Sequence, residues 1–195
     1  MILDKVISKY NLVLASNSPR RKQFLTDLGV PYSVRTANVE EVYPETLKAS
    51  EITNYLAKLK AAPLLEDLAK NELLITSDTI VWLNEVALGK PANEKDAFEM
   101  ISSLSGTSHK VISSVCLSTK QQQIVESVTT KVTFRILTKE EILYYITNFK
   151  PFDKAGAYGI QEWIGHIGIT SIEGSYNNVV GLPTAQFYQM LQKFI

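Results

Sequence analysis

Short apolar runs alternate with amphipathic runs along the chain, and the spacing within each run predicts its secondary structure. Residues 11–15 consist of Asn11 followed by four apolar residues, which is typical of a short buried strand. The run that follows places Phe24, Leu25 and Leu28 on one face of a helix, and Gly29 is suited to end it. The beginning of the chain therefore predicts a strand followed by a helix.

The middle of the chain continues this alternation. Residues 32–36 predict a second strand, and residues 51–60 have helical spacing, with Ser50 as the N-cap and Pro63 ending or kinking the helix. Residues 73–83 are apolar and predict a strand that is interrupted at residues 77–79.

The second half predicts a hairpin and further helices. A helix begins at Asn93 and stops before Gly106, and residues 109–136 predict a long antiparallel pair that turns near residues 121–122. Thr138 is suited to cap a helix that runs to about residue 149, and Pro183 can begin the last helix. One face of the second hairpin strand is predicted to carry Val128, Val132, Phe134 and Ile136.

Strands that alternate with helices, together with hairpins, predict an α/β fold with a mixed sheet and flanking helices. The 195 residues suit one domain or two tightly joined lobes, and we treat residues 1–195 as a single domain with a cleft.

Composition narrows the function. Twenty Lys and Arg balance twenty Asp and Glu, so the chain lacks the cationic surplus of a protein that coats a nucleic acid polymer. The zero net charge does not exclude a small anionic ligand, because a few basic side chains in one cleft are enough to bind it. Residues 1–10 have no long apolar centre typical of a signal peptide, and no apolar run is long enough for a membrane helix. The single cysteine, Cys116, predicts a reducing compartment and hence the cytoplasm.

The first candidate site lies between the first strand and the first helix, at residues 16–21. Ser18 can cap the helix and Pro19 fits its first turn, so free amides and the helix dipole favour an anion there. Ser16, Arg20 and Arg21 would bind phosphate oxygens. The alternative is an ordinary helix cap with two solvated arginines.

The second candidate is Asp78, an acid in the middle of an apolar strand. Burying such a group is costly unless it is paired, binds a metal or faces a cleft, so function is favoured. The alternative is a short loop in which Asp78 caps a turn.

For three further residues, the sequence gives weaker evidence of a role in ligand binding. Lys60 lies on the predicted helix of residues 51–60, and Lys90 is flanked by a glycine and a proline that would fix its turn. Gln161 ends a glycine-rich segment and could bind the edge of a base through its amide. A tight structural crossing is the alternative for that segment.

Several other chemistries are disfavoured. His109 and His166 do not lie at metal-ligand spacing from a cysteine or a second histidine, and the chain has neither a P-loop nor a Gly-x-Ser-x-Gly elbow. Cys116 lies in a predicted strand and is expected to be buried and inert.

Six segments in sequence order resemble the Maf family of nucleotide pyrophosphatases, and the match covers roughly residues 11–191. The segments are residues 14–21, 56–61, 77–81, 88–91, 153–161 and 174–183. The family is similar in fold to inosine-triphosphate pyrophosphatases, which implies a mixed sheet and two lobes around a central cleft.

The resemblance also implies roles for individual residues. Asp78 matches the acid that activates water, and Lys60 and Lys90 match phosphate-binding lysines. Glu40 matches an acidic position near a divalent metal, Mg²⁺ or Mn²⁺, which Asp78 would also bind. The positions linked to base choice are Arg20, Thr79 and Gln161.

Thr79 after the acid, with Gln161 present, is the pattern of the branch that acts on dTTP and UTP, whereas the branch preferring 7-methyl-GTP tends to carry glutamine at the first position. The chain departs from the family pattern at residues 162–171, where the family often has a glycine-rich segment and a different strand sequence.

Two other functions remain open at this level. The protein could sense a nucleotide without turnover and regulate cell division or septum formation, a role that is associated with the family. It could also remove modified nucleotides. A homodimer is compatible with the family, although the sequence has no clear interface stripe.

Overall fold

The computed structural model describes residues 1–195, and the chain forms two compact units. Unit 1 comprises Met1–Asp78, Ser113–Val128 and Gly181–Ile195, and unit 2 comprises Thr79–Ile112 and Thr129–Val180. Three long strands, β3 (Glu72–Leu83), β5 (Ser108–Ser118) and β6 (Gln123–Phe134), contribute residues to both units. The remaining strands are β1 (Asn11–Leu14), β2 (Tyr32–Val34), β4 (Val86–Leu88) and β7 (Ile169–Glu173). The seven-stranded sheet has the order β2-β1-β3-β5-β6-β7, and β4 pairs with β3.

Unit 1 contains the parallel part of the sheet. Strand β1 (Asn11–Leu14) pairs in parallel with β2 (Tyr32–Val34) on one side and with β3 on the other. Its helices are α1 (Ile2–Lys9), α2 (Pro19–Asp27), α3 (Ser50–Ala61), α8 (Thr184–Leu191) and the short 3₁₀ helices η1 (Ala62–Leu64) and η3 (Gln192–Phe194).

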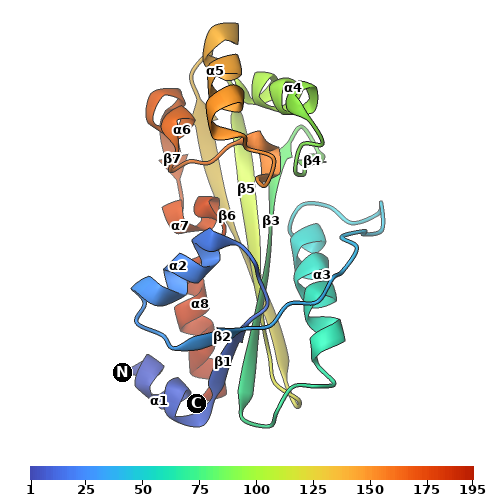
Figure 1. Ribbon diagram of the computed structural model, residues 1–195, viewed down its shortest axis with the longest axis vertical. Coiled ribbons are helices and arrows are strands. Elements are labelled where there is room, and N and C mark those ends of the chain that lie inside the picture. The colour runs from blue at the N-terminus through green and yellow to red at the C-terminus, as the bar shows by residue number, and fades with distance from the viewer. The chain divides into compact units, whose positions relative to one another are not determined.

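Both faces of the β1–β3 pair in unit 1 are covered. Leu12, Leu14, Leu73 and Ile75 pack in one core with α1, α2 and α8, whereas the alternate residues pack on the other face with α3 and η1. Figure 1 shows α3 on the opposite side of these strands from α1 and α8. Because side chains alternate between two buried faces, the paired stretches Leu12–Leu14 and Leu73–Ile75 are apolar at every position.

Unit 2 contains antiparallel pairs. Strand β4 (Val86–Leu88) pairs with β3, and β7 (Ile169–Glu173) pairs with β6. Its helices are α4 (Glu94–Leu104), α5 (Lys139–Phe149), α6 (Trp163–Gly168), α7 (Tyr176–Val180) and the 3₁₀ helix η2 (Ala155–Ala157). Its core joins strand residues to α4 and α5, with Val111, Val132, Phe134, Ile101 and Tyr145 fully buried. The prediction of an α/β fold with a mixed sheet and flanking helices is confirmed.

Two predicted helix caps are confirmed. The Ser18 side chain accepts a hydrogen bond from the backbone N–H of Arg21, and the Thr138 side chain caps α5. Asn93, at which a helix was predicted to begin, is the N-cap of α4. The cap predicted at Ser50 is wrong, because Ser50 is already the first residue of α3 and Ala49 precedes it with a φ of 48°.

Two strand predictions are wrong. Strand β3 is continuous from Glu72 to Leu83, so the polar residues 77–79 do not interrupt it. The fourth residue of the predicted apolar face, Ile136, is 80% exposed because β6 ends at Phe134 after an irregular register. Val132 and Phe134 are buried as predicted.

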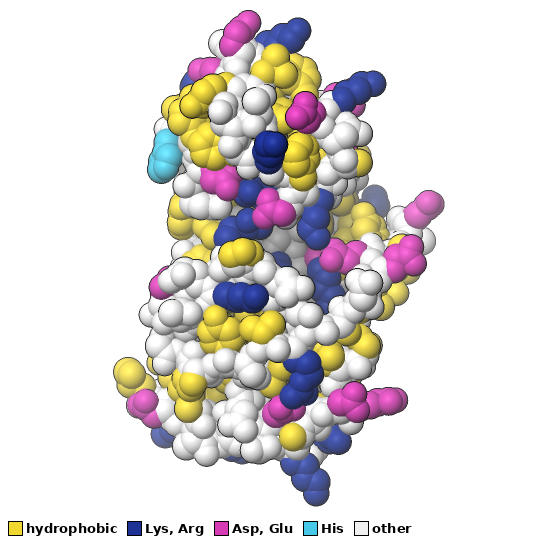
Figure 2. Space-filling model, viewed as in Figure 1, with side chains coloured by type: hydrophobic (Ala, Val, Ile, Leu, Met, Phe, Trp, Pro, Cys, Tyr) yellow, Lys and Arg dark blue, Asp and Glu magenta, His cyan; other side chains and the backbone are white.

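The helices of the structure lack the combination of length and hydrophobicity that a membrane-spanning segment requires. Figure 2 shows basic and acidic side chains interspersed over the visible surface, as the zero net charge leads one to expect.

His109 is buried in unit 2 and gives the fold a specific pH dependence. Its Nε2 contacts the Tyr158 hydroxyl at 2.7 Å, its Nδ1 has no partner, and Phe134 stacks on its ring. Burial lowers the pKa of His109 from 6.5 to about 4. Between these values the unfolded chain binds a proton that the folded chain does not, so stability falls as the pH falls through this window and is unaffected above it.

We therefore expect the free energy of unfolding to lose about 2 kcal/mol at His109 between pH 7 and pH 5, since each pKa unit is worth about 1.4 kcal/mol. Urea denaturation at both pH values would measure this loss. The His109→Gln variant has no titrating ring and serves as the reference. Equal pH dependence of the two proteins would contradict the prediction.

Candidate functional site

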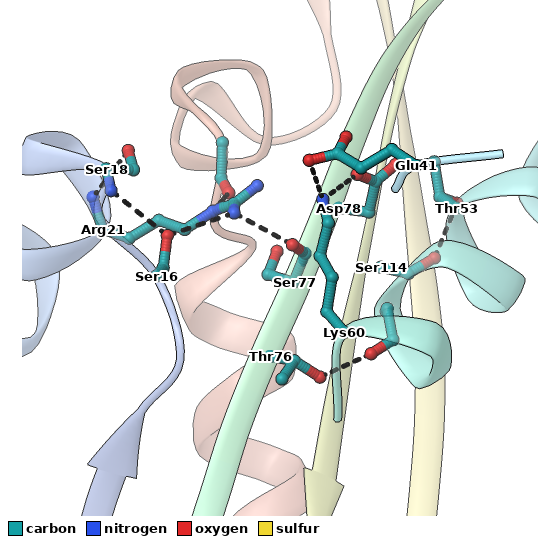
Figure 3. Close-up of polar contacts among 12 residues, drawn as sticks. Ser16, Ser18, Arg21, Glu41, Thr53, Lys60, Thr76, Ser77, Asp78 and Ser114 are labelled. Carbon is teal, nitrogen blue, oxygen red and sulfur yellow. Dashed lines mark hydrogen bonds and ion pairs between the residues drawn. The ribbon is translucent and has the colours of Figure 1, made fainter. Parts of the chain in front are cut away.

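Three successive polar residues of β3 direct their side chains to alternate faces of the strand in unit 1. The Thr76 hydroxyl donates a 2.7 Å hydrogen bond to the backbone carbonyl of Ala57 in α3. Asp78, two residues later, contacts Lys60 of the same helix. Figure 3 shows Lys60 and Asp78 meeting on the α3 side of the strand, while Ser16 and Arg21 approach it from the α2 side.

The two carboxylate oxygens of Asp78 have different surroundings. Oδ1 accepts a 2.6 Å hydrogen bond from the Lys60 ammonium, whereas Oδ2 is buried without a hydrogen-bond partner. Only 4% of Asp78 is exposed. A buried, unpaired carboxylate oxygen is costly in a protein interior, and such groups are concentrated at sites that bind a ligand, metal or water. The lysine compensates the charge and leaves the second oxygen available for chemistry.

Helix α3 is held against the strands in a way that fixes the position of Lys60. The Ser114 hydroxyl of β5 contacts the Thr53 hydroxyl at 2.6 Å and the Asn54 amide oxygen at 2.8 Å. Together with the Thr76 bond to the α3 backbone, these contacts tie the helix to two strands. Lys60 lies in the last turn of α3, with a side chain that is 17% exposed.

Of the two neighbouring acids Glu40 and Glu41, it is Glu41 that contacts Lys60. Its Oε1 lies 3.2 Å from the Lys60 ammonium, so this lysine contacts two carboxylates. Glu40, which the resemblance implied, is exposed, and its backbone carbonyl accepts from Val42. The metal-binding role of Glu40 remains a prediction. The segment that contains Glu40 and Glu41 has no regular periodicity, so the sequence alone could not predict which of the two side chains contacts Lys60.

Arg21 is bound to protein acceptors on three sides. Its Nε donates to the Gly181 carbonyl at 2.9 Å, and its Nη1 donates to the Ser77 carbonyl at 2.9 Å and to the Ser16 hydroxyl at 3.4 Å. Burial lowers the pKa of Arg21, while the charge of Asp78 acts in the opposite direction. Ser16 is buried and also accepts from the backbone N–H of Ser18. The guanidinium of Arg21 therefore joins α2 to the strand residue that precedes Asp78.

The remaining predicted residue of unit 1 is Arg20. It is partly buried in the first turn of α2, next to Arg21 in sequence. Direct contacts thus join Ser16 to Arg21 and join Lys60 to both Asp78 and Glu41. The hydrogen bond from Arg21 to the Ser77 carbonyl connects these two groups through β3.

The predicted residues of unit 2 are Thr79, Lys90 and Gln161. Thr79 is partly buried, and exposed Lys90 follows β4. The turn of Lys90 is tied to η2 by a 2.9 Å bond from the Gly156 N–H to the Gly89 carbonyl. Gly156 has a φ of 65°, and a Cβ there would lie 2.7 Å from a Val81 methyl, so both conformation and space require glycine.

Metal binding can be tested against the donors present. No group of three or more acidic, histidine or cysteine side chains gathers in the structure. Magnesium does not need one, because it commonly retains several waters and binds one or two carboxylates together with substrate phosphates. Asp78, with a buried unpaired Oδ2, fits this pattern, and an acid of the 40–41 pair fits the second position.

Comparison with known proteins adds to this geometry. A family model described as "Maf-like protein" matches residues 11–194. A protein of Flavobacterium johnsoniae named "dTTP/UTP pyrophosphatase" is 54% identical over 194 residues, covering 100% of both chains. Proteins with the same name from Christiangramia forsetii and Phocaeicola vulgatus are 52% and 54% identical, and the alignments cover 96% or more of each chain.

A solved structure resembles the fold. The chain is similar to the structure described as that of the Staphylococcus aureus Ham1 protein, with a TM-score of 0.54 and 16% sequence identity. The similarity covers 95% of this chain and 100% of the other. At this identity the likeness concerns the fold alone.

Proposed function

The chain belongs to the Maf family, and on that premise we propose that it hydrolyses dTTP and UTP to the monophosphate and pyrophosphate. The observation that carries the proposal is the buried carboxylate of Asp78, with one oxygen on Lys60 and the other unpaired. A protein that only bound an anion would gain nothing from an acid at this point.

Asp78 is proposed as the general base. Its Oδ2 would accept the proton of a water whose oxygen bonds to the α-phosphorus, while the bond from this phosphorus to the bridging oxygen breaks and pyrophosphate leaves with the electron pair. Lys60 holds Oδ1 at 2.6 Å, so the carboxylate is oriented before the water arrives.

Cations of the chain would compensate the charge of the triphosphate. Lys60, Lys90 and Arg20 are proposed to bind phosphate oxygens, together with Ser16, which lies in the segment between β1 and α2. When bound through Asp78 and Glu40 or Glu41, Mg²⁺ or Mn²⁺ would neutralise phosphate charge and make the attacking water more acidic. Arg21 is proposed to act mainly by positioning, because its guanidinium donates to the carbonyls of Gly181 and Ser77 and to the Ser16 hydroxyl.

The proposal is tested by product analysis in ¹⁸O-labelled water. We expect dTTP and UTP to yield pyrophosphate and a monophosphate that carries the label, because attack at the α-phosphorus adds the water oxygen there. The panel would include the other canonical nucleotides, modified pyrimidine nucleotides and 7-methyl-GTP, with Mg²⁺ or Mn²⁺. Binding without any turnover would overturn the proposal in favour of a nucleotide sensor. A cytoplasmic location belongs to the same proposal.

Base selection is assigned to Arg20, Thr79 and Gln161. We expect Gln161→Ala to reduce the preference for dTTP over dCTP about tenfold, because an amide that pairs with the thymine edge leaves its polar atoms unpaired with the wrong base. The ratio of kcat/KM for the two nucleotides measures this preference. An unchanged ratio would contradict a role for Gln161 in base recognition.

A further inference from the structure

The segment in which the chain departs from the family pattern begins with Glu162, directly after Gln161. Glu162 is the N-cap residue of α6, but its side chain makes no capping hydrogen bond. It turns instead towards α5, where Oε2 accepts a hydrogen bond from the Tyr145 hydroxyl. The other carboxylate oxygen, Oε1, lies 3.1 Å from the Lys154 ammonium. Both oxygens of Glu162 are thus engaged within unit 2.

Tyr145 and Glu162 also make hydrogen bonds with the backbone of the turn that contains Gln161. The Tyr145 hydroxyl accepts a 3.0 Å hydrogen bond from the Gly159 N–H, and the Gly159 carbonyl accepts one of 3.0 Å from the Glu162 N–H. Tyr145 therefore donates to one end of the turn and accepts from the other. The turn is fixed from both ends by one side chain of a rigid helix.

The network is buried and charged. The Lys154 side chain is 9% exposed and also contacts Asp153 at 2.7 Å, while the Glu162 side chain is 21% exposed. Tyr145 is fully buried. Burial raises the pKa of Tyr145, and its contact with Glu162 acts in the same direction, so the hydroxyl keeps the proton that it donates. Removal of one partner would leave a buried charge or polar group without compensation.

Gln161 is linked to this network by close packing over Gly159. A Cβ at position 159 would lie 2.9 Å from the carboxyl carbon of Glu162 and 3.0 Å from the amide nitrogen of Gln161. The two side chains therefore pass over the same backbone position. The Gln161 amide therefore lies beside the backbone of the turn, and its position depends on how that turn is held.

We propose that Glu162 and Tyr145 are positioning residues for substrate selection, and that they hold the Gln161 turn so that its amide meets the base in one orientation. This rests on the proposed role of Gln161 in base recognition. Selection requires an amide that reaches the base from a fixed position, because an amide that shifts with its turn could approach either pyrimidine edge.

Tyr145→Phe removes only the hydroxyl that joins Glu162 to Gly159, and Glu162→Gln keeps the shape but removes the charge facing Lys154. We expect each variant to lower the kcat/KM ratio of dTTP over dCTP about fivefold to tenfold, with a loss of kcat for dTTP of less than about threefold. Tyr144→Phe is the matched control. It alters an exposed tyrosine of the same helix, whose ring packs at an angle of 56° against the Trp163 ring, and it should leave the ratio unchanged.

A double-mutant cycle separates positioning from a general structural effect. In the Gln161→Ala background, Tyr145→Phe should change the ratio no further, because both act through the same amide. Equal losses for dTTP and dCTP in both backgrounds, or a wild-type ratio in either folded variant, would overturn the proposal. These outcomes differ from failure of the proposed function, in which the wild-type protein itself would release no pyrophosphate.

Discussion

Replacing Asp78 with asparagine should lower kcat for dTTP about a thousandfold while nucleotide binding persists. Asparagine retains an oxygen that can accept from Lys60, but an amide cannot take a proton from water at neutral pH. Loss of a positioned general base typically costs about 10²–10⁴-fold. Pyrophosphate release measures turnover, and equilibrium binding of dTTP to the variant measures retention of the site.

A second acid of the same strand provides the control for this experiment. Glu72 begins β3 and is paired with Arg35 at 2.6 Å, an arrangement that lowers the pKa of Glu72. Glu72→Gln changes an ion-paired acid of β3 to its amide, as Asp78→Asn does, and should leave kcat within about twofold of the wild-type value. If Asp78→Asn retains normal turnover, Asp78 is not the base.

The sequence predicted most of the elements of unit 1 because their signals are local. The cap at Ser18 and the apolar run of β1 are both contained within a few residues. The continuity of β3 could not be predicted in the same way. Asp78 is stabilised within the strand by Lys60, which is 18 residues away, so only the folded chain shows how a polar residue is accommodated there. The short elements α6 and β7 were not predicted.

Within the candidate site, the sequence predicted that acidic and basic residues take part, but it could not assign roles to two like-charged residues that are adjacent in the chain. Glu40 and Glu41 are adjacent in a segment without regular periodicity, and contact with Lys60 distinguishes them. Arg20 and Arg21 lie in the first turn of a helix, where successive side chains point about 100° apart. One residue of such a pair can bind protein acceptors while the other points elsewhere. The network of Tyr145 and Glu162 joins residues 17 positions apart and left no signal in a local motif.

The distinction between the two arginines leads to the largest expected effect on stability. Arg21→Ala removes the donors from the buried carbonyls of Ser77 and Gly181 and from the Ser16 hydroxyl. A buried acceptor that loses its partner costs about 1–3 kcal/mol, so we expect the free energy of unfolding to fall by about 3 kcal/mol. The kcat for dTTP should fall as well, because the Ser77 carbonyl immediately precedes Asp78. Urea denaturation and pyrophosphate release measure the two effects.

Two further variants test whether Arg21 acts by positioning. Arg21→Lys keeps the charge, but an ammonium lacks the planar fork that reaches both carbonyls, so this variant should also be destabilised. Arg20→Ala removes the neighbouring guanidinium, which is proposed to contact the substrate, and should raise KM while changing stability by less than about 1 kcal/mol. If Arg21→Ala instead keeps full stability and only raises KM, then Arg21 binds substrate directly, as the sequence predicted, and the contacts with Ser77 and Gly181 contribute little to the fold.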